Sequence, residues 1–121
     1  MGRVATALQK EVYRANLALA RSGLVMGTFG NVSGVDRAAG LMAIKPSGVP
    51  YDELKPEHIV PVSLSTGKVV GSGLRPSSDT PTHLALYRAF RSCGGIVHTH
   101  SESATALAQA GLPVRCLGTT H

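Results

Sequence analysis

The segment Gly94–Ser101 constrains the fold of this chain more than any other. Its two glycines interrupt a preceding helix, and the β-branched pair that follows favours a strand, which we expect over residues 96–100. Because side chains at alternate strand positions leave the same face, the imidazoles of His98 and His100 point in the same direction. Imidazole suits Zn, Fe, Ni or Cu better than Mg or Ca, so the pattern favours a transition-metal site. The simpler interpretation is an ordinary hydrogen-bonded histidine at each position.

Length and charge limit the classes of protein to which the chain can belong. Its 121 residues, 43% of them apolar, predict a single domain over residues 1–121 with a real core. The net charge of +5 is spread thinly, and three tyrosines, two phenylalanines and no tryptophan are too few for a nucleic-acid stacking platform. We therefore expect no nucleic-acid partner. The charge is compatible with small anionic substrates, although it could equally serve solubility alone.

No leader or membrane-spanning pattern is visible in the sequence. The N-terminus lacks a basic region followed by an apolar one, and no apolar stretch approaches the roughly 20 residues of a membrane span. Cys93 and Cys116 are too few, and too far apart, for a disulfide framework. These features predict a cytoplasmic protein with reduced cysteines and no membrane partner.

Apolar periodicity and turn residues divide the chain into helices and short strands. Helical periodicity, glycine stops and caps predict helical segments over residues 4–22, 51–58, 81–92 (capped by Thr80) and from Ser101 to Gly111. β-Branched runs between turns predict strands within residues 28–36, 41–44, 59–64, 68–70, 96–100 and 114–117. The fold class is therefore α/β, with a mixed, largely antiparallel sheet.

Three loops carry groups that suit a phosphate. They contain Asn31 between Gly30 and Ser33, Lys45 before Ser47 and Gly48, and the pair Ser77 and Ser78. Amide, hydroxyl and glycine N–H donors together with one lysine can bind a phosphate dianion without a Walker-type loop. Taken singly, each loop is better interpreted as an ordinary Ser/Gly turn, and Lys45 as a solvated charge. Only their convergence in space would make them a site.

Asp79 is the carboxylate of greatest interest, and its role has two interpretations. It can be a helix-start residue, since Asp is favoured there. It can also lie beside the histidine pair as a metal ligand or a general base. His121 is a possible third ligand, because catalytic zinc sites commonly use three protein ligands.

Taken together, the motifs resemble those of the class II aldolase/adducin family. The segments that carry the resemblance are Gly30–Ser33, Ile44–Val49, Lys68–Val70, Pro76–His83, Val97–Ser101 and Leu117–His121. They occur in the order and spacing of that family across nearly the whole chain. The resemblance implies a three-layer α/β/α fold and a homotetramer with active sites between subunits. It also implies a divalent metal held by three histidines, of which two match His98 and His100.

The same resemblance implies roles for the loop residues. The sugar-phosphate pocket would be formed by Asn31, Lys45, Ser47, Gly48, Ser77 and Ser78. Asp79 matches a metal-site carboxylate of the epimerase branch, whereas the aldolase branch carries a glutamate there that serves as base. The metal would be Zn²⁺, with Mn²⁺ or Co²⁺ as alternatives.

The implied reaction is epimerisation at carbon 4 of L-ribulose 5-phosphate to D-xylulose 5-phosphate in pentose catabolism. A metal-assisted retro-aldol cleavage of the C3–C4 bond would be followed by its re-formation on the other aldehyde face. Two alternatives stay open: a fuculose-1-phosphate type aldolase, and a non-catalytic adducin-like scaffold or inactive fragment. The family continues beyond the Gly-Thr-Thr-His segment, with a third metal histidine, an acid/base aspartate and a tyrosine. The chain is therefore expected to be the N-terminal part of such an enzyme.

Overall fold

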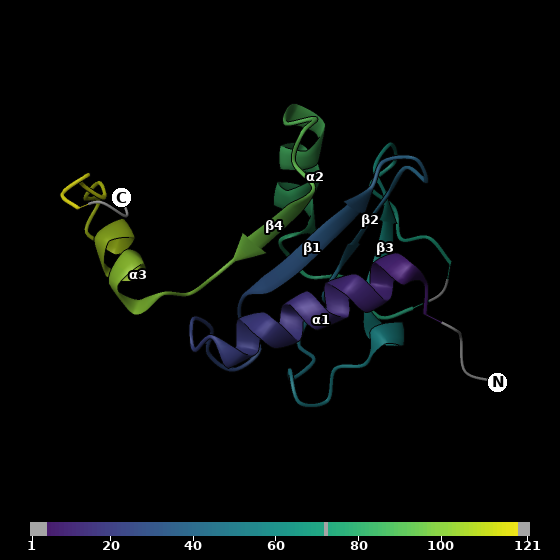
Figure 1. Cartoon of the computed structure of the whole chain (residues 1–121), viewed down its shortest axis with the longest axis horizontal. Helices are drawn as coiled ribbons and strands as arrows, with labels where there is room; N and C mark the ends of the chain where they lie inside the picture. Colours follow the sequence, from purple (N-terminus) through teal and green to yellow (C-terminus); the bar gives the residue numbers. More distant parts are fainter. Residues whose placement is uncertain (1–4, 72, 119–121) are drawn as a thin grey trace.

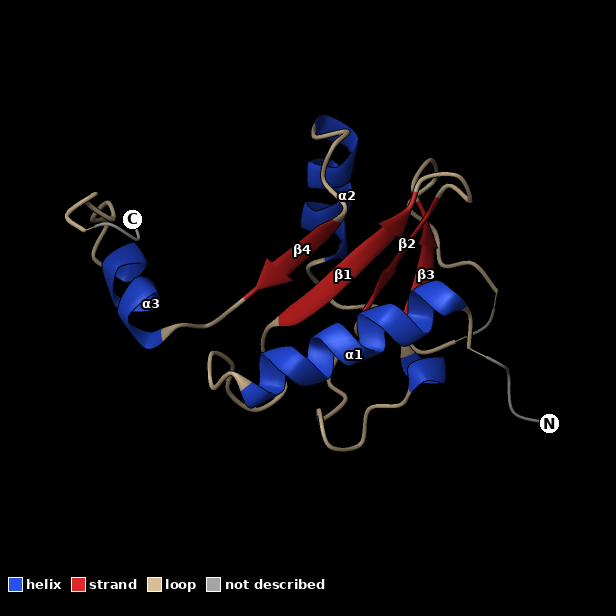
Figure 2. Cartoon of the chain, in the orientation of Figure 1, coloured by secondary structure: helices blue, strands red, loops and turns tan. Residues whose placement is uncertain are grey.

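A computed structural model describes residues 5–71 and 73–118 of the chain, and it contains a four-stranded sheet with helices (Figures 1 and 2). In chain order the elements are α1 (Ala7–Arg21), β1 (Asn31–Asp36), β2 (Leu41–Ile44), the short 3-10 helix η1 (Pro56–His58), β3 (Val60–Ser63), α2 (Thr80–Ala89), β4 (Gly95–His98) and α3 (Glu102–Gln109).

The sheet has the strand order β3-β2-β1-β4, and every pairing between these strands is antiparallel. The largely antiparallel sheet that the sequence predicts is confirmed, and within the described residues it contains no parallel pair. The turn between β1 and β2 is tight, with Gly40 at a φ of +68°, so these strands can only run in opposite directions. On the other side of β1, strand β4 pairs in a register that sets Asn31 opposite His98.

Helices cover both faces of the sheet, which confirms the three-layer α/β/α prediction. Met42 and Ile44 point toward α2, where they form a buried cluster with Leu84 and Tyr87. The intervening Ala43 points to the other face and packs in the cluster that contains Val12 of α1. This alternation along β2 is what a strand buried on both faces requires. The core therefore consists of two apolar layers separated by the sheet.

Helix α1 begins later than the apolar periodicity suggests, because Thr6 caps it. The Thr6 hydroxyl accepts a hydrogen bond from the Gln9 backbone N–H, and the Gln9 side chain accepts one from the Thr6 N–H, which makes a capping box. The predicted stop at Gly23 is confirmed by its φ of +75°. Asn16, an unexpected buried polar residue, exchanges hydrogen bonds with both backbone groups of Val32 and so fixes α1 on β1.

Several predicted boundaries are wrong. Helix α2 starts at Thr80 and ends at Ala89, so Asp79, not Thr80, is at the N-cap position. Residues 68–70 contribute only an isolated bridge, between Val69 and Val62. No strand forms over residues 114–117, because these residues lie against no strand edge with which to pair.

Helix α3 projects away from the sheet and buries none of its residues (Figure 1). It follows Ser101 and stops before Gly111, whose φ is +68°, as predicted. Within the described part of the chain, none of the helices combines the length and the apolar character that crossing a bilayer demands.

Candidate functional site

Four segments that are far apart in sequence meet at one edge of the sheet. Because the strands are antiparallel, β1 begins at the edge where β2 and β4 end. This places Asn31, Lys45 and His98 together. The loop before α2 joins them through backbone bonds, since the Ser77 N–H donates to the Lys45 carbonyl at 3.0 Å and the Ser47 N–H donates to the Arg75 carbonyl at 2.9 Å.

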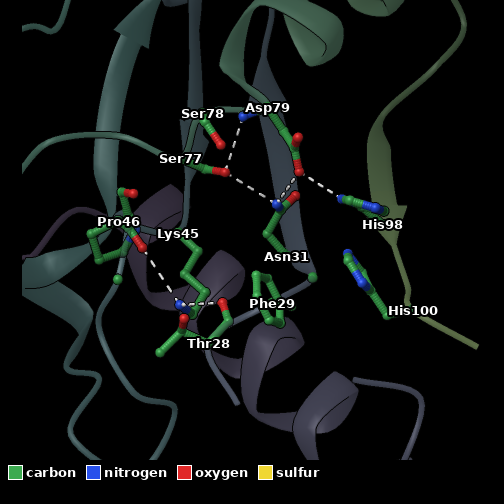
Figure 3. A pocket seen from close by; sticks show the side chains of 13 residues that line it. Thr28, Phe29, Asn31, Lys45, Pro46, Ser77, Ser78, Asp79, His98 and His100 are labelled. Atoms are coloured by element: carbon green, nitrogen blue, oxygen red, sulfur yellow. Dashed lines mark hydrogen bonds and ion pairs between the residues drawn. The ribbon is translucent and has the colours of Figure 1, made fainter. Parts of the chain in front are cut away.

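The meeting point encloses a cavity of about 380 Å³ (Figure 3). All nine residues singled out from the sequence line it: Asn31, Lys45, Ser47, Gly48, Ser77, Ser78, Asp79, His98 and His100. Thr28, Phe29, Gly30 and Pro46 complete the lining. The three loops therefore converge in space, as a shared binding site requires.

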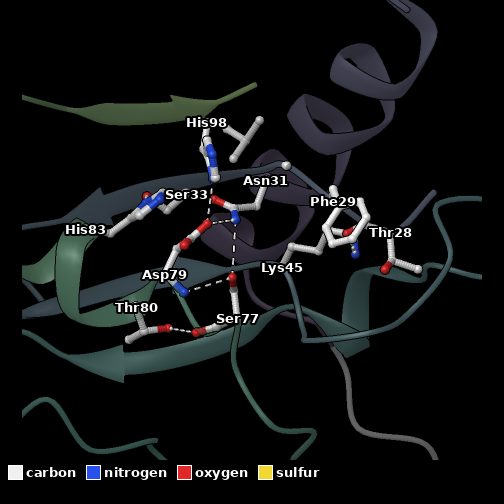
Figure 4. A network of polar contacts seen from close by, with 12 residues as sticks. Thr28, Phe29, Asn31, Ser33, Lys45, Ser77, Asp79, Thr80, His83 and His98 are labelled. Atoms are coloured by element: carbon white, nitrogen blue, oxygen red, sulfur yellow. Dashed lines mark hydrogen bonds and ion pairs between the residues drawn. The ribbon is translucent and has the colours of Figure 1, made fainter. Parts of the chain in front are cut away.

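Asp79 lies at the centre of a polar network (Figure 4). Its Oδ2 accepts hydrogen bonds from Asn31 Nδ2 at 2.7 Å and from His98 Nδ1 at 2.6 Å. Asp79 occupies the N-cap position of α2, as the helix-start interpretation has it, but its side chain makes no capping bond. Burial alone would raise the pKa of this carboxyl, but hydrogen bonds from Asn31 and His98 and the charges of His98 and His83 hold the pKa below its ordinary value. Asp79 is therefore ionised at neutral pH.

The two histidines of the central segment both face the cavity, but only His98 belongs to a strand. The strand β4 ends at His98, shorter than predicted, because the His100 N–H donates to the Leu24 carbonyl at 2.9 Å instead of to a strand. The ring centroids of His98 and His100 are 4.8 Å apart, and Phe29 stacks on His100 at 5.3 Å. The imidazoles are thus neighbours on one wall of the cavity.

A complete metal centre is not formed by the described residues alone. Across residues 5–71 and 73–118, no group of three or more His, Cys, Asp or Glu side chains is arranged to hold an ion. His121, the possible third ligand, lies outside the described residues.

Lys45 is a buried cation on the opposite wall. The residue is 1% exposed, and its ammonium donates to the Val49 carbonyl at 2.7 Å and lies 4.7 Å from the centroid of the Tyr51 ring. No carboxylate within the described ranges forms an ion pair with it. Burial lowers the pKa of Lys45. An anion entering the cavity would supply the missing negative charge.

Asn31 contributes an unused acceptor. Its Nδ2 donates to Asp79 and to the Ser77 hydroxyl at 3.2 Å, whereas its Oδ1 is buried without a hydrogen-bond partner among the described residues. Buried polar atoms rarely stay unpaired, since each costs about 1–3 kcal/mol. Asn31 itself lines the cavity, so a ligand hydroxyl bound there is the expected partner for this oxygen.

Sequence reasoning missed a polar relay beneath the site. The Ser33 hydroxyl lies 2.6 Å from His83 Nδ1 and 2.8 Å from the Tyr87 hydroxyl, and all three side chains are buried. Burial lowers the pKa of His83, although the nearby Asp79 charge opposes that shift. The sequence spacing could have indicated these contacts, because Ser33 shares a strand face with Asn31, and His83 lies one helical turn after Asp79.

Comparison with known proteins gives a consistent result. A family model described as the Class II Aldolase and Adducin N-terminal domain matches residues 10–121. The L-ribulose-5-phosphate 4-epimerase UlaF of Salmonella paratyphi C (strain RKS4594) is 57% identical over 114 residues, which cover 94% of this chain and 50% of that protein. The chain thus spans about half the length of the curated relatives it matches.

Solved structures agree with the fold. An L-fuculose 1-phosphate aldolase superimposes with a TM-score of 0.83 at 34% identity, covering 98% of this chain and 54% of that one. The L-fuculose-1-phosphate aldolase of Thermus thermophilus superimposes with a TM-score of 0.67 at 28% identity, covering 84% of this chain and 50% of that one.

Proposed function

The chain belongs to the class II aldolase and adducin family, and we propose that its cavity is part of the active site of a metal-dependent sugar-phosphate 4-epimerase. The substrate would be L-ribulose 5-phosphate and the product D-xylulose 5-phosphate. The observation that carries the proposal is that one cavity contains both metal-binding and phosphate-binding groups. Imidazoles and a carboxylate line one wall, and a buried lysine with hydroxyl and amide donors lines the other.

The donor set suits a divalent transition metal. Because Asp79 accepts a hydrogen bond from Nδ1 of His98, the lone pair of the neutral ring is left at Nε2, the arrangement common for metal-binding histidines. We propose His98 and His100 as ligands and Asp79 as the carboxylate of the metal site, with a further ligand from outside the described residues. The resemblance favours Zn²⁺, with Mn²⁺ or Co²⁺ as alternatives. When bound, the cation would stabilise, as a Lewis acid, the negative charge that develops on the ketone side of the substrate.

Carbon 4 of the substrate carries no acidic hydrogen, so direct deprotonation there is unfavourable. Cleavage of the C3–C4 bond, with loss of the proton from the carbon-4 hydroxyl, produces an aldehyde that carries the phosphate and a three-carbon enediolate. Re-formation of the bond on the other aldehyde face, with return of the proton to oxygen, inverts carbon 4. Oδ1 of Asn31 is available to accept a hydrogen bond from a substrate hydroxyl in this region.

Retention of the phosphorylated fragment distinguishes an epimerase from an aldolase. Lys45 supplies a cation without a carboxylate partner among the described residues. Ser47, Gly48, Ser77 and Ser78 supply hydroxyl or backbone donors around the same cavity. Together these groups can hold a phosphate dianion while the aldehyde rotates.

The full-length protein would work as a cytoplasmic homotetramer in pentose catabolism, on the arabinose or the ascorbate route. Analytical ultracentrifugation tests the assembly, because a monomer would argue against sites shared between subunits.

The central experiment incubates the metal-loaded, full-length enzyme with L-ribulose 5-phosphate and measures D-xylulose 5-phosphate and free aldehyde separately. We expect ketose epimerisation without accumulation of aldehyde. Accumulation of the phosphorylated aldehyde would instead support an aldolase, which the 34% identity to an L-fuculose 1-phosphate aldolase favours as the second candidate. An intact protein that binds no metal by inductively coupled plasma analysis would support the adducin-like scaffold.

A further inference from the structure

A second cavity, of about 290 Å³, lies at the far end of α2 from Asp79 and is lined by three arginines. Arg37 follows β1, whereas Arg88 and Arg91 lie at the end of α2 and just beyond it. At 1.5 Å per residue, Arg88 is about 14 Å from Asp79 along the helix axis. Ser65, in the turn after β3, also lines the cavity. No residue is shared with the cavity at the other end of α2.

Two of the guanidinium groups are held in place by backbone carbonyls. Arg37 donates to three carbonyls around the end of α2, at distances from 2.8 to 3.2 Å. Arg88 donates to the carbonyls of Leu64 and Ser65 at 2.9 and 3.3 Å. These contacts fix the orientation of both groups but bring no formal negative charge, so the arginines remain electrostatically unneutralised.

Many donors in the cavity are unused. A guanidinium carries five N–H groups, of which Arg37 uses three and Arg88 uses two. Arg91 forms no hydrogen bond or ion pair with any residue of the described ranges, and none of the three arginines pairs there with a carboxylate. Arg88 and Arg91 line the same cavity, so their like charges repel each other. A bound anion would relieve that repulsion.

We propose that this arginine cavity binds a small multivalent anion of the phosphate class. Guanidinium groups bind phosphate oxygens through paired N–H donors, and two pre-oriented groups lose little side-chain freedom on binding. The competing explanation is that these arginines only satisfy backbone carbonyls at the end of α2. It accounts for Arg37 and Arg88 but not for Arg91, which lines the same cavity and satisfies no carbonyl in the described part of the chain.

Calorimetric titration of the full-length protein with inorganic pyrophosphate tests the proposal. Because the first cavity also offers phosphate donors, the titration is run in the wild-type and Lys45→Met backgrounds. In the Lys45→Met background we expect one remaining site, with an affinity that falls as NaCl is raised. Arg91→Gln should weaken that site about ten-fold, which corresponds to the loss of one charge-assisted contact. Arg14→Gln, an identical charge change on the exposed face of α1, should leave it within about two-fold.

Arg91 is exposed and forms no hydrogen bond or ion pair with a described residue, so the variant should fold normally. Equal pyrophosphate affinity in the Arg91→Gln and Arg14→Gln proteins would overturn the proposal. A change in oligomeric mass on Arg91→Gln, with pyrophosphate affinity unchanged, would also overturn it, because the arginines would then bind a carboxylate of another subunit.

Discussion

Oδ2 of Asp79 lies 2.6 Å from Nδ1 of His98, although the two residues belong to different elements and are separated by 19 positions in the chain. The bond joins the start of α2 to the end of β4. Because of this bond the Asp79 carboxylate does not cap α2, and the orientation of the His98 imidazole is fixed.

Asp79→Asn should weaken metal binding by about 10–100-fold, whether the carboxylate touches the metal or only orients His98. The measurement is metal affinity by competition with a chelating dye, together with turnover of L-ribulose 5-phosphate. Asp52→Asn, at an exposed position that does not line the cavity, is the control. Wild-type affinity and turnover in the Asp79 variant would remove this residue from the metal site.

His98→Ala should abolish epimerase activity and lower the metal content, while the circular dichroism spectrum stays that of the wild type. The imidazole is partly exposed at the end of an edge strand, so its loss leaves the two apolar layers intact. His58→Ala, which removes an imidazole from η1, should keep its metal and activity. Normal turnover without His98 would contradict the proposed ligand role.

Lys45→Met should raise KM for the phosphorylated substrate by about ten-fold or more and change kcat much less, because a uniform binding contact is lost. Methionine keeps the buried stem packed. The loss of the ammonium's contacts with the Val49 carbonyl and the Tyr51 ring is offset by the relieved cost of burying a charge, so the free energy of unfolding should change little. Lys55→Met, at an exposed position, serves as the matched variant. Steady-state kinetics measure the effect. An unchanged KM would show that Lys45 does not bind the phosphate.

The stability of the protein should fall as the pH drops below about 6.5, the ordinary pKa of histidine, because His83 is buried and its pKa is lowered. With a lowered folded-state pKa, the unfolded chain binds more protons between the two values. The free energy of unfolding therefore rises with pH across that window, and this contribution is lost below it. Urea unfolding at several pH values should show this slope in the wild type. A slope that persists undiminished in His83→Gln would assign it to another group.

Gly30→Ala should be far more harmful than Gly40→Ala. Both glycines have positive φ, at +76° and +68°, so each substitution costs about 1–2 kcal/mol of backbone strain. At Gly30 the new Cβ would also clash with Val25 Cγ1 and lie 2.9 Å from the His98 carbonyl oxygen, whereas at Gly40 it would meet no atom of the described residues within 4 Å. Thermal unfolding of the two variants measures the difference. Equal melting temperatures would show that the Gly30 turn does not hold β1 against His98.

The sequence by itself determined the elements and the types of residue at the site. Capping residues, glycine stops and alternating apolar positions act over a few neighbours, so they predicted α1, the β1–β2 hairpin and the helix after Ser101, with errors mainly at their ends. The predicted strand over residues 114–117 failed, because β-branched residues form a strand only beside an available edge. The donor types in the loops likewise followed from local pattern.

Tertiary structure alone decided that these donors share one cavity. The antiparallel register sets Asn31 opposite His98, and the docking of the Ser77 loop on Lys45 brings Asp79 to both. Such long-range pairings depend on how two apolar layers pack against the sheet, which no local pattern encodes. The orphaned oxygen of Asn31 and the relay through Ser33 and His83 arise in the same way. They come from burial, which brings together polar groups that the sequence keeps far apart.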